Sequence, residues 1–113
     1  MTGWPFWHVT LTVAGVAVAD TEIRLGLERL SHEHPFLLSG RYSVDRAEVR
    51  YWEEAPDAGT VVALALRLWD DHRASALLPD WSVVGVEVVD RDTFHRRGRL
   101  PLSPVSLVGV APF

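Results

Sequence analysis

The sequence predicts an α+β fold, a two-layer sandwich in which two helices cover one face of a four-stranded antiparallel sheet. Segments in which apolar residues alternate are typical of half-buried strands, and segments with apolar residues at helical spacing indicate helices. These segments follow one another in the order β-α-β-β-α-β. A chain of 113 residues, of which 48% are hydrophobic, is long enough for one domain with its own core. We expect a single domain over residues 1–113, with a core at about 6–90, a charged connector at 91–99 and an uncharged tail at 100–113.

The first part of the chain supplies a strand and a helix. In residues 7–13 apolar residues alternate with His8 and with threonines, which indicates a strand with one apolar face. Asp20 is expected to be the N-cap of the first helix, and Pro35 ends that helix because the residue before a proline avoids the helical region. Three apolar residues recur within it at helical spacing: Ile23, Leu27 and Leu30.

The second part adds a hairpin, a helix and a strand. Asp57 or Thr60 is expected to cap the second helix, which is rich in alanine and leucine. The strand after this helix is the most β-branched segment of the chain. The expected segments are two hairpin strands at 36–44 and 47–54, a helix at 61–76 and a strand at 81–89.

This order of elements resembles the ferredoxin-like fold. The resemblance covers roughly residues 7–89 and concerns the order of elements, because no signature motif accompanies it. In the dimeric α/β-barrel families, two ferredoxin-like domains oppose their sheets, and each subunit holds its ligand between sheet and helices. The resemblance therefore implies a homodimer with a small-molecule ligand, although a fold that hosts many functions does not name one.

The face of the sheet that the two helices leave open has a mixed character. On the expected register it carries both charged and aromatic residues, and Trp52, Phe6 and Arg50 are the candidates for a dimer interface. Either the uncharged tail folds back over this face, or a second copy covers it; the tail has a third option, which is to add a strand at an edge. The face is expected to comprise Phe6, His8, Thr10, Thr12, Glu48, Arg50, Trp52, Val83 and Glu87.

Composition excludes several classes of function. The chain has no cysteine, which removes disulfides, thiolate zinc sites and cysteine nucleophiles. The formal net charge is −4, and the one basic cluster, at residues 95–99, is short and follows Asp90 and Asp92, so nucleic-acid binding is not expected. Neither a signal peptide with a basic start nor a membrane-spanning segment is recognised, and no cofactor motif is present. We expect a cytoplasmic protein without a cofactor.

The two histidines in the stretch "SHEHPF" have a His-x-His spacing that resembles a pair of metal ligands. His32 and His34 lie about 200° apart on a helix, so they do not share an ion there. A metal site is therefore not expected, and the segment is better explained as the end of a helix before Pro35. His34 and His72 are not expected to be neighbours, because His72 lies far along a helix that runs antiparallel to the first.

His72 is the strongest candidate for chemistry. A helical wheel aligns it with Val61, Ala65, Leu68 and Ala76, so we expect it on the face that packs on the sheet. It either lines a pocket with Trp69 and Tyr51, or it is a core histidine bonded to a backbone carbonyl, to Tyr42 or to Tyr51. His8, on the open face, is the second candidate for a catalytic group.

These observations favour a non-catalytic binding or assembly module that self-associates. The alternative is a cofactor-free enzyme of the dimeric α/β-barrel type, with His72 or His8 as its general base. A further alternative is an interaction subunit for another protein.

Overall fold

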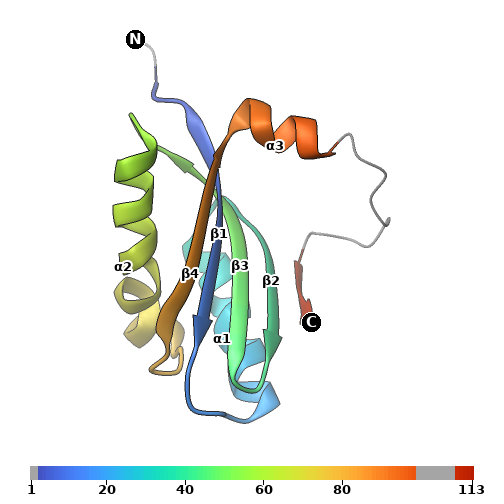
Figure 1. Cartoon of the computed structure of the whole chain (residues 1–113). Helices are drawn as coiled ribbons and strands as arrows, with labels where there is room; N and C mark the ends of the chain where they lie inside the picture. Colours follow the sequence, from blue (N-terminus) through green and yellow to red (C-terminus); the bar gives the residue numbers. More distant parts are fainter. Residues whose placement is uncertain (1–2, 99–108) are drawn as a thin grey trace.

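The computed structural model describes residues 3–98 and 109–113 (Figure 1). The elements are β1 (Phe6–Ala14), α1 (Asp20–Glu33), β2 (Leu37–Ser43), β3 (Arg46–Glu54), α2 (Ala58–Ala76), β4 (Ser82–Asp90), α3 (Arg91–Gly98) and β5 (Gly109–Pro112). The α+β class is confirmed, as is the β-α-β-β-α-β order of the first six elements.

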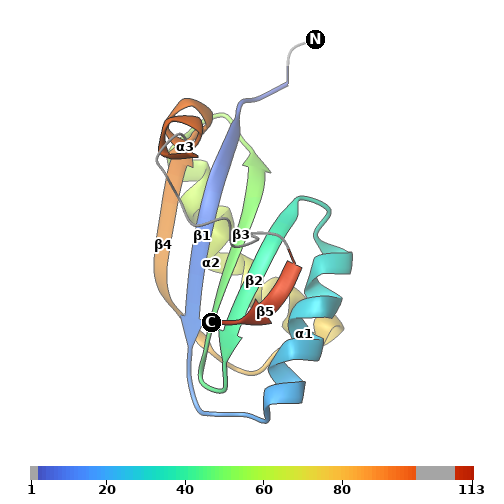
Figure 2. The ribbon, with the colours of Figure 1, turned by 90° about the vertical axis from the view of Figure 1, so that its right-hand side faces the viewer.

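The sheet has one strand more than expected. The strand order is β4-β1-β3-β2-β5, and the pairs β4–β1, β1–β3 and β3–β2 are antiparallel. The fifth strand, β5, pairs in parallel with β2, so the sheet is mixed and the expectation of a purely antiparallel sheet was wrong (Figure 2). Of the three options for the tail, residues 109–112 take edge addition, and 100–108 lie outside the described residues.

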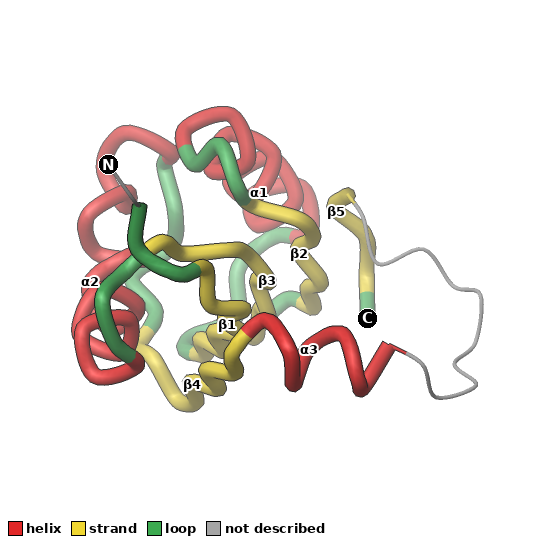
Figure 3. Tube along the Cα trace, turned by 90° about the horizontal axis from the view of Figure 1, so that it is seen from above, coloured by secondary structure: helices red, strands yellow, loops and turns green. Residues whose placement is uncertain are grey.

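The core lies between the sheet and the helices α1 and α2, which share one face of the sheet (Figure 3). Alternate residues of β1 and β3 point into it, as the period-two pattern predicts. The side chains that are completely inaccessible include Val9, Leu11 and Val13 from β1, Ala47, Val49 and Tyr51 from β3, and Ile23 and Leu30 from α1.

The helix ends are partly as expected. The side chain of Asp57 accepts a hydrogen bond from the backbone N–H of Thr60 at 2.7 Å, and the same contact lowers the pKa of Asp57. At α1 the expected cap was wrong by one residue, because Ala19 is the N-cap and Asp20 is already helical. Asp20 still places a negative charge in the first turn, where the helix dipole favours it.

A bulge changes the face of one residue in β4. Thr12 is opposite Gly85, whereas Val13 is opposite Val83, so one extra residue of β4 is inserted at Val84. Val83 consequently packs against the core and not on the open face, where it was expected. Glu87, on the far side of the bulge, keeps the expected face and bonds Arg97 there.

The charged connector is a helix and not an irregular link. Residues Arg91–Gly98 form α3, which lies on the opposite side of the sheet from α1 and α2 (Figure 3). Asp90 begins it by accepting a hydrogen bond from the backbone N–H of Thr93 at 2.7 Å. The open face is therefore covered at one end by the chain's own helix.

Candidate functional site

The end of the open face beneath α3 holds a cluster of aromatic rings. His8 of β1 is stacked on Phe94 of α3, with ring centroids 4.2 Å apart and planes inclined by 26°. Trp52 of β3 meets both rings edge-on, at 5.4 Å from His8 and 4.9 Å from Phe94. The period-two pattern explains this meeting, since His8 and Trp52 are direct neighbours across β1 and β3.

His8 is one of two polar residues that are buried among the described residues, and it is only 4% exposed. Burial beneath the rings lowers the pKa of His8 to about 4, and the positive charge of Arg50 contributes to the same shift. The imidazole is therefore neutral at pH 7. Its contacts with Phe94 and Trp52 are therefore those of an uncharged aromatic ring.

A cavity of about 350 Å³ opens beside this cluster. Its walls combine aromatic rings with two nitrogen-bearing side chains of α3, and none of the described residues that line it is acidic. The lining residues are Phe6, Phe36, Trp52, Arg91 and His95. This composition suits a small ligand that has an apolar ring and a polar end.

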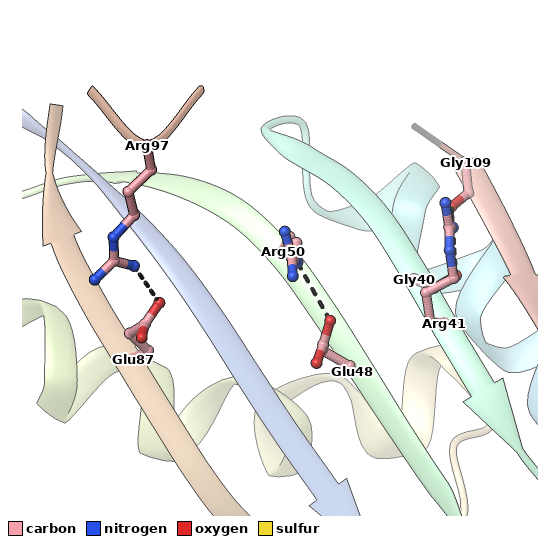
Figure 4. A network of polar contacts seen from close by, with 7 residues as sticks. All are labelled: Gly40, Arg41, Glu48, Arg50, Glu87, Arg97 and Gly109. Carbon is pink, nitrogen blue, oxygen red and sulfur yellow. Dashed lines mark hydrogen bonds and ion pairs between the residues drawn. The ribbon is translucent and has the colours of Figure 1, made fainter. Parts of the chain in front are cut away.

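A second cavity, of about 240 Å³, is bounded by Phe94 and by residues of the open face. Charged residues of the open face surround it in ion pairs. The guanidinium of Arg97 lies 2.9 Å from Glu87, and that of Arg50 lies 3.2 Å from Glu48 (Figure 4). The cavity is lined by His8, Thr10, Arg50, Glu87, Val89, Phe94, Arg97 and Gly98. Since these charges already neutralise one another, this cavity is less suited to a charged ligand than the first.

The candidates for a dimer interface meet in the same region. Phe6 and Trp52 line the larger cavity, and Arg50 lines the smaller one. Sequence reasoning thus placed these three residues on the side of the sheet where the structure has them. Self-association through them stays a prediction.

The structure does not place His72 where the helical wheel put it. Its side chain is 26% exposed and lies between the two helices, where Nδ1 donates to Glu33 at 2.7 Å. Ser75 donates to the same carboxylate at 2.7 Å. The hydrogen bond from Ser75 and, to a smaller extent, that from His72 lower the pKa of Glu33. The partner of His72 is therefore a carboxylate of α1, neither a backbone carbonyl nor Tyr42 or Tyr51.

The expectation that His34 and His72 are far apart was wrong, because their ring centroids are 6.4 Å apart. Leu37, the first residue of β2, is opposite Tyr51, so β3 extends three residues beyond the start of β2. Because α2 begins after this extension, its first turns lie beyond the end of α1. The C-terminal half of α2 then lies beside the end of α1 (Figure 1).

The ring of His34 also contacts Tyr51, at 4.9 Å between centroids. Nδ1 of His34 and the hydroxyl of Tyr51 are both buried without a hydrogen-bond partner among the described residues. Burial lowers the pKa of His34, with a contribution from the nearby His72, and raises that of Tyr51. Two unpaired polar atoms in the core cost stability, and they make this the least satisfied part of the closed face.

Trp69 and Tyr51, the expected partners of His72 in a ligand pocket, are packed into the core. The indole N–H of Trp69 donates to the carbonyl of Pro79 at 2.9 Å, and its ring is parallel to that of Trp81, 6.1 Å away. Tyr51 is completely buried. These contacts give both residues structural roles on the closed face.

Within residues 3–98 and 109–113, no group of three or more histidine and acidic side chains is arranged to hold a metal ion. His32 is exposed, whereas His34 faces Tyr51, so the two histidines of "SHEHPF" diverge as their helical phase predicts. None of the helices in the described part of the chain is long and apolar enough to cross a membrane.

Sequence reasoning missed the contribution of α3. Phe94, Arg91 and His95 were treated as parts of a charged connector, although Phe94 stands alone as an apolar residue among charges. An isolated aromatic residue in a charged segment that follows the last predicted strand is a signal for a helix that covers the open face of the sheet. Phe36, at the start of the second strand, was not recognised either.

Comparison with known families gives a group without an assigned activity. The model of a domain of unknown function, DUF8830, matches residues 6–103, so the chain belongs to this family. No curated protein matches the sequence.

Proposed function

We propose that this member of a family of unknown function is a non-catalytic binding module, and that it holds a small molecule in the cavity between α3 and the open face of the sheet. The observation that carries the proposal is the composition of the cavity of about 350 Å³: three aromatic rings, an arginine and a histidine. A volume in this range matches small-molecule sites, which are mostly apolar with a few placed polar groups.

The state of His8 favours binding over catalysis. A general base works best when its pKa lies near the working pH, and the pKa of His8 is lowered to about 4. His72, the other candidate base, is engaged with Glu33 between the helices, away from the cavity. These two placements weigh against the alternative of a cofactor-free enzyme.

The five tryptophans offer a direct test. The indole N–H groups of Trp7, Trp69 and Trp81 donate to backbone carbonyls, whereas Trp52 lines the cavity. In protein labelled with ¹⁵N, we expect members of a set of small aromatic compounds to move the indole signal of Trp52 and to leave that of Trp69 in place. The Trp52→Phe variant identifies the signal.

A set of single-ring and two-ring compounds, both neutral and charged, that leaves the Trp52 signal unmoved at millimolar concentration contradicts the proposal. Shifts of Trp69 and Trp81 comparable to that of Trp52 contradict it as well, because they indicate unspecific binding or unfolding. Mass spectrometry of the purified protein under native conditions adds an independent readout, namely a retained small molecule.

The module is also proposed to self-associate through the part of the open face that α3 leaves uncovered. This part carries charges of both signs in Glu48 and Arg50, and such a mixed surface complements itself across a two-fold axis (Figure 4). Thr12, opposite Glu48 and Gly85, lies at its centre.

Equilibrium sedimentation at several protein concentrations tests this part of the proposal. We expect a dimer for the wild-type chain and a weaker one for Thr12→Lys, with exposed Val62→Lys on α2 as the control. A monomer at every concentration, or equal weakening by both variants, contradicts self-association through this face.

A further inference from the structure

Three aromatic rings form the apolar walls of the larger cavity. Phe6 from β1 and Phe36, which directly precedes β2, meet edge-to-face with centroids 5.6 Å apart, and Trp52 from β3 completes the wall. Phe36 is 50% exposed although it is a large apolar residue. Exposed rings around a cavity are suited to hold a flat apolar group by stacking and edge contacts.

The polar side of the cavity comes from α3. Arg91 and His95 are four residues apart, so both side chains reach the same side of this helix. Within the described residues, the guanidinium of Arg91 takes part in no ion pair, in contrast to Arg50 and Arg97 on the same face of the sheet. Among the described residues that line the cavity, Arg91 carries a positive charge and none is acidic.

An arginine that makes no ion pair within residues 3–98 and 109–113, and that lines a cavity with aromatic walls, indicates a ligand class. Its planar guanidinium presents two parallel N–H donors that match the two oxygens of a carboxylate. A cavity of about 350 Å³ has room for one or two rings and a short polar group. From these features, and resting on the proposed binding function, we infer that the ligand is a small aromatic carboxylate, with its ring among Phe6, Phe36 and Trp52 and its carboxylate on Arg91.

Two probes of nearly the same shape test the inference: 2-naphthoate, which is an anion, and 2-naphthamide, which is neutral. Their binding is followed through the indole signal of Trp52 in the ¹⁵N-labelled full chain. We expect naphthoate to bind roughly tenfold more tightly, since a charge-assisted pair with arginine favours it.

Two variants assign the effect to the cavity. Arg91→Gln is expected to abolish the preference for naphthoate, chiefly by weakening the binding of naphthoate. Arg46→Gln, at the opposite end of β3 from Trp52, removes the same charge from an exposed residue and is expected to leave the preference intact. Phe36→Ala is expected to weaken both probes severalfold, because it removes an exposed wall without opening the core.

The outcomes separate this inference from the proposed function. Equal affinities for the two probes overturn the aromatic carboxylate and leave a binding cavity in place. A preference that survives in Arg91→Gln, or that Arg46→Gln reduces as much, overturns the role of Arg91. If neither probe moves the Trp52 signal, the binding function itself is contradicted.

Discussion

The two faces of the sheet are built by the same strands, yet they differ in composition and in cover. The face toward α1 and α2 is apolar and packed, with Val9, Leu11 and Val13 completely inaccessible. The face toward α3 combines ion pairs, aromatic rings and two cavities, and it contains the buried His8. The closed face can therefore supply most of the stability, which leaves the open face free to vary its chemistry.

The sharpest test of this difference uses two leucines of the same helix. Leu30 of α1 is inaccessible, whereas Leu25 is 41% exposed. We expect Leu30→Ala to lower the free energy of unfolding by about 2–5 kcal/mol and Leu25→Ala by less than about 1 kcal/mol. Both variants replace leucine by alanine within α1, so helix propensity changes equally in the two. The difference between their free energies of unfolding, measured by urea denaturation with an unchanged m-value, therefore reports the difference in burial. Equal losses contradict the assigned core.

A smaller loss is expected on the open face. Phe94→Ala removes the ring contacts of α3 with His8 and Trp52, and we expect a loss of about 1–2 kcal/mol by urea denaturation. Exposure of the imidazole is expected to raise the pKa of His8 from about 4 toward its ordinary value, as followed by NMR titration. Phe113→Ala is the control, since that ring is 62% exposed. An unchanged His8 titration in Phe94→Ala shows that Phe94 does not cover the imidazole.

The lowered pKa of His8 also predicts a dependence of stability on pH. Between pH 4 and 6.5 the unfolded chain binds a proton that folded His8 does not, so the stability due to this residue decreases as the pH falls through that window. The variant His8→Phe keeps the ring and removes the titration. From pH 7 to pH 5, the urea midpoint is expected to decrease more for the wild type than for this variant. Identical decreases contradict the burial of a neutral imidazole.

The smallest effect is expected at Tyr51, on the closed face. Its hydroxyl is buried without a partner among the described residues, so Tyr51→Phe removes a desolvation cost and is expected to change the free energy of unfolding by less than about 1 kcal/mol, in the stabilising direction. A clear destabilisation in urea denaturation identifies a hydrogen bond to this hydroxyl, from a water or from His34. The His34→Phe variant distinguishes these two sources.

The elements with strong periodicity were predictable. Alternation in β1 and β3 depends only on which neighbours are apolar, and the spacing of Ile23, Leu27 and Leu30 marks the buried side of α1. The bulge at Val84 was not predictable, because a single inserted residue leaves the composition of β4 unchanged while it moves Val83 to the other face.

The candidate site was only partly predictable. His8, Trp52, Phe6 and Arg50 were placed on the correct face, since period two determines the face of a residue within a strand. The helical wheel failed for His72, because a wheel gives a direction around the helix axis and does not distinguish a sheet from a neighbouring helix. The neighbour at that angle is the end of α1, with Glu33.

The sequence by itself determined the α+β class, the order of the first six elements and the apolar sides of β1 and β3, because local periodicity specifies these features. Only the tertiary structure decided that α3 covers one end of the open face and that β5 extends the sheet. The eight residues of α3 have no buried face of their own, so their position depends on the contact of Phe94 with His8 and Trp52. The cavity between them exists only because residues from four distant parts of the chain meet there.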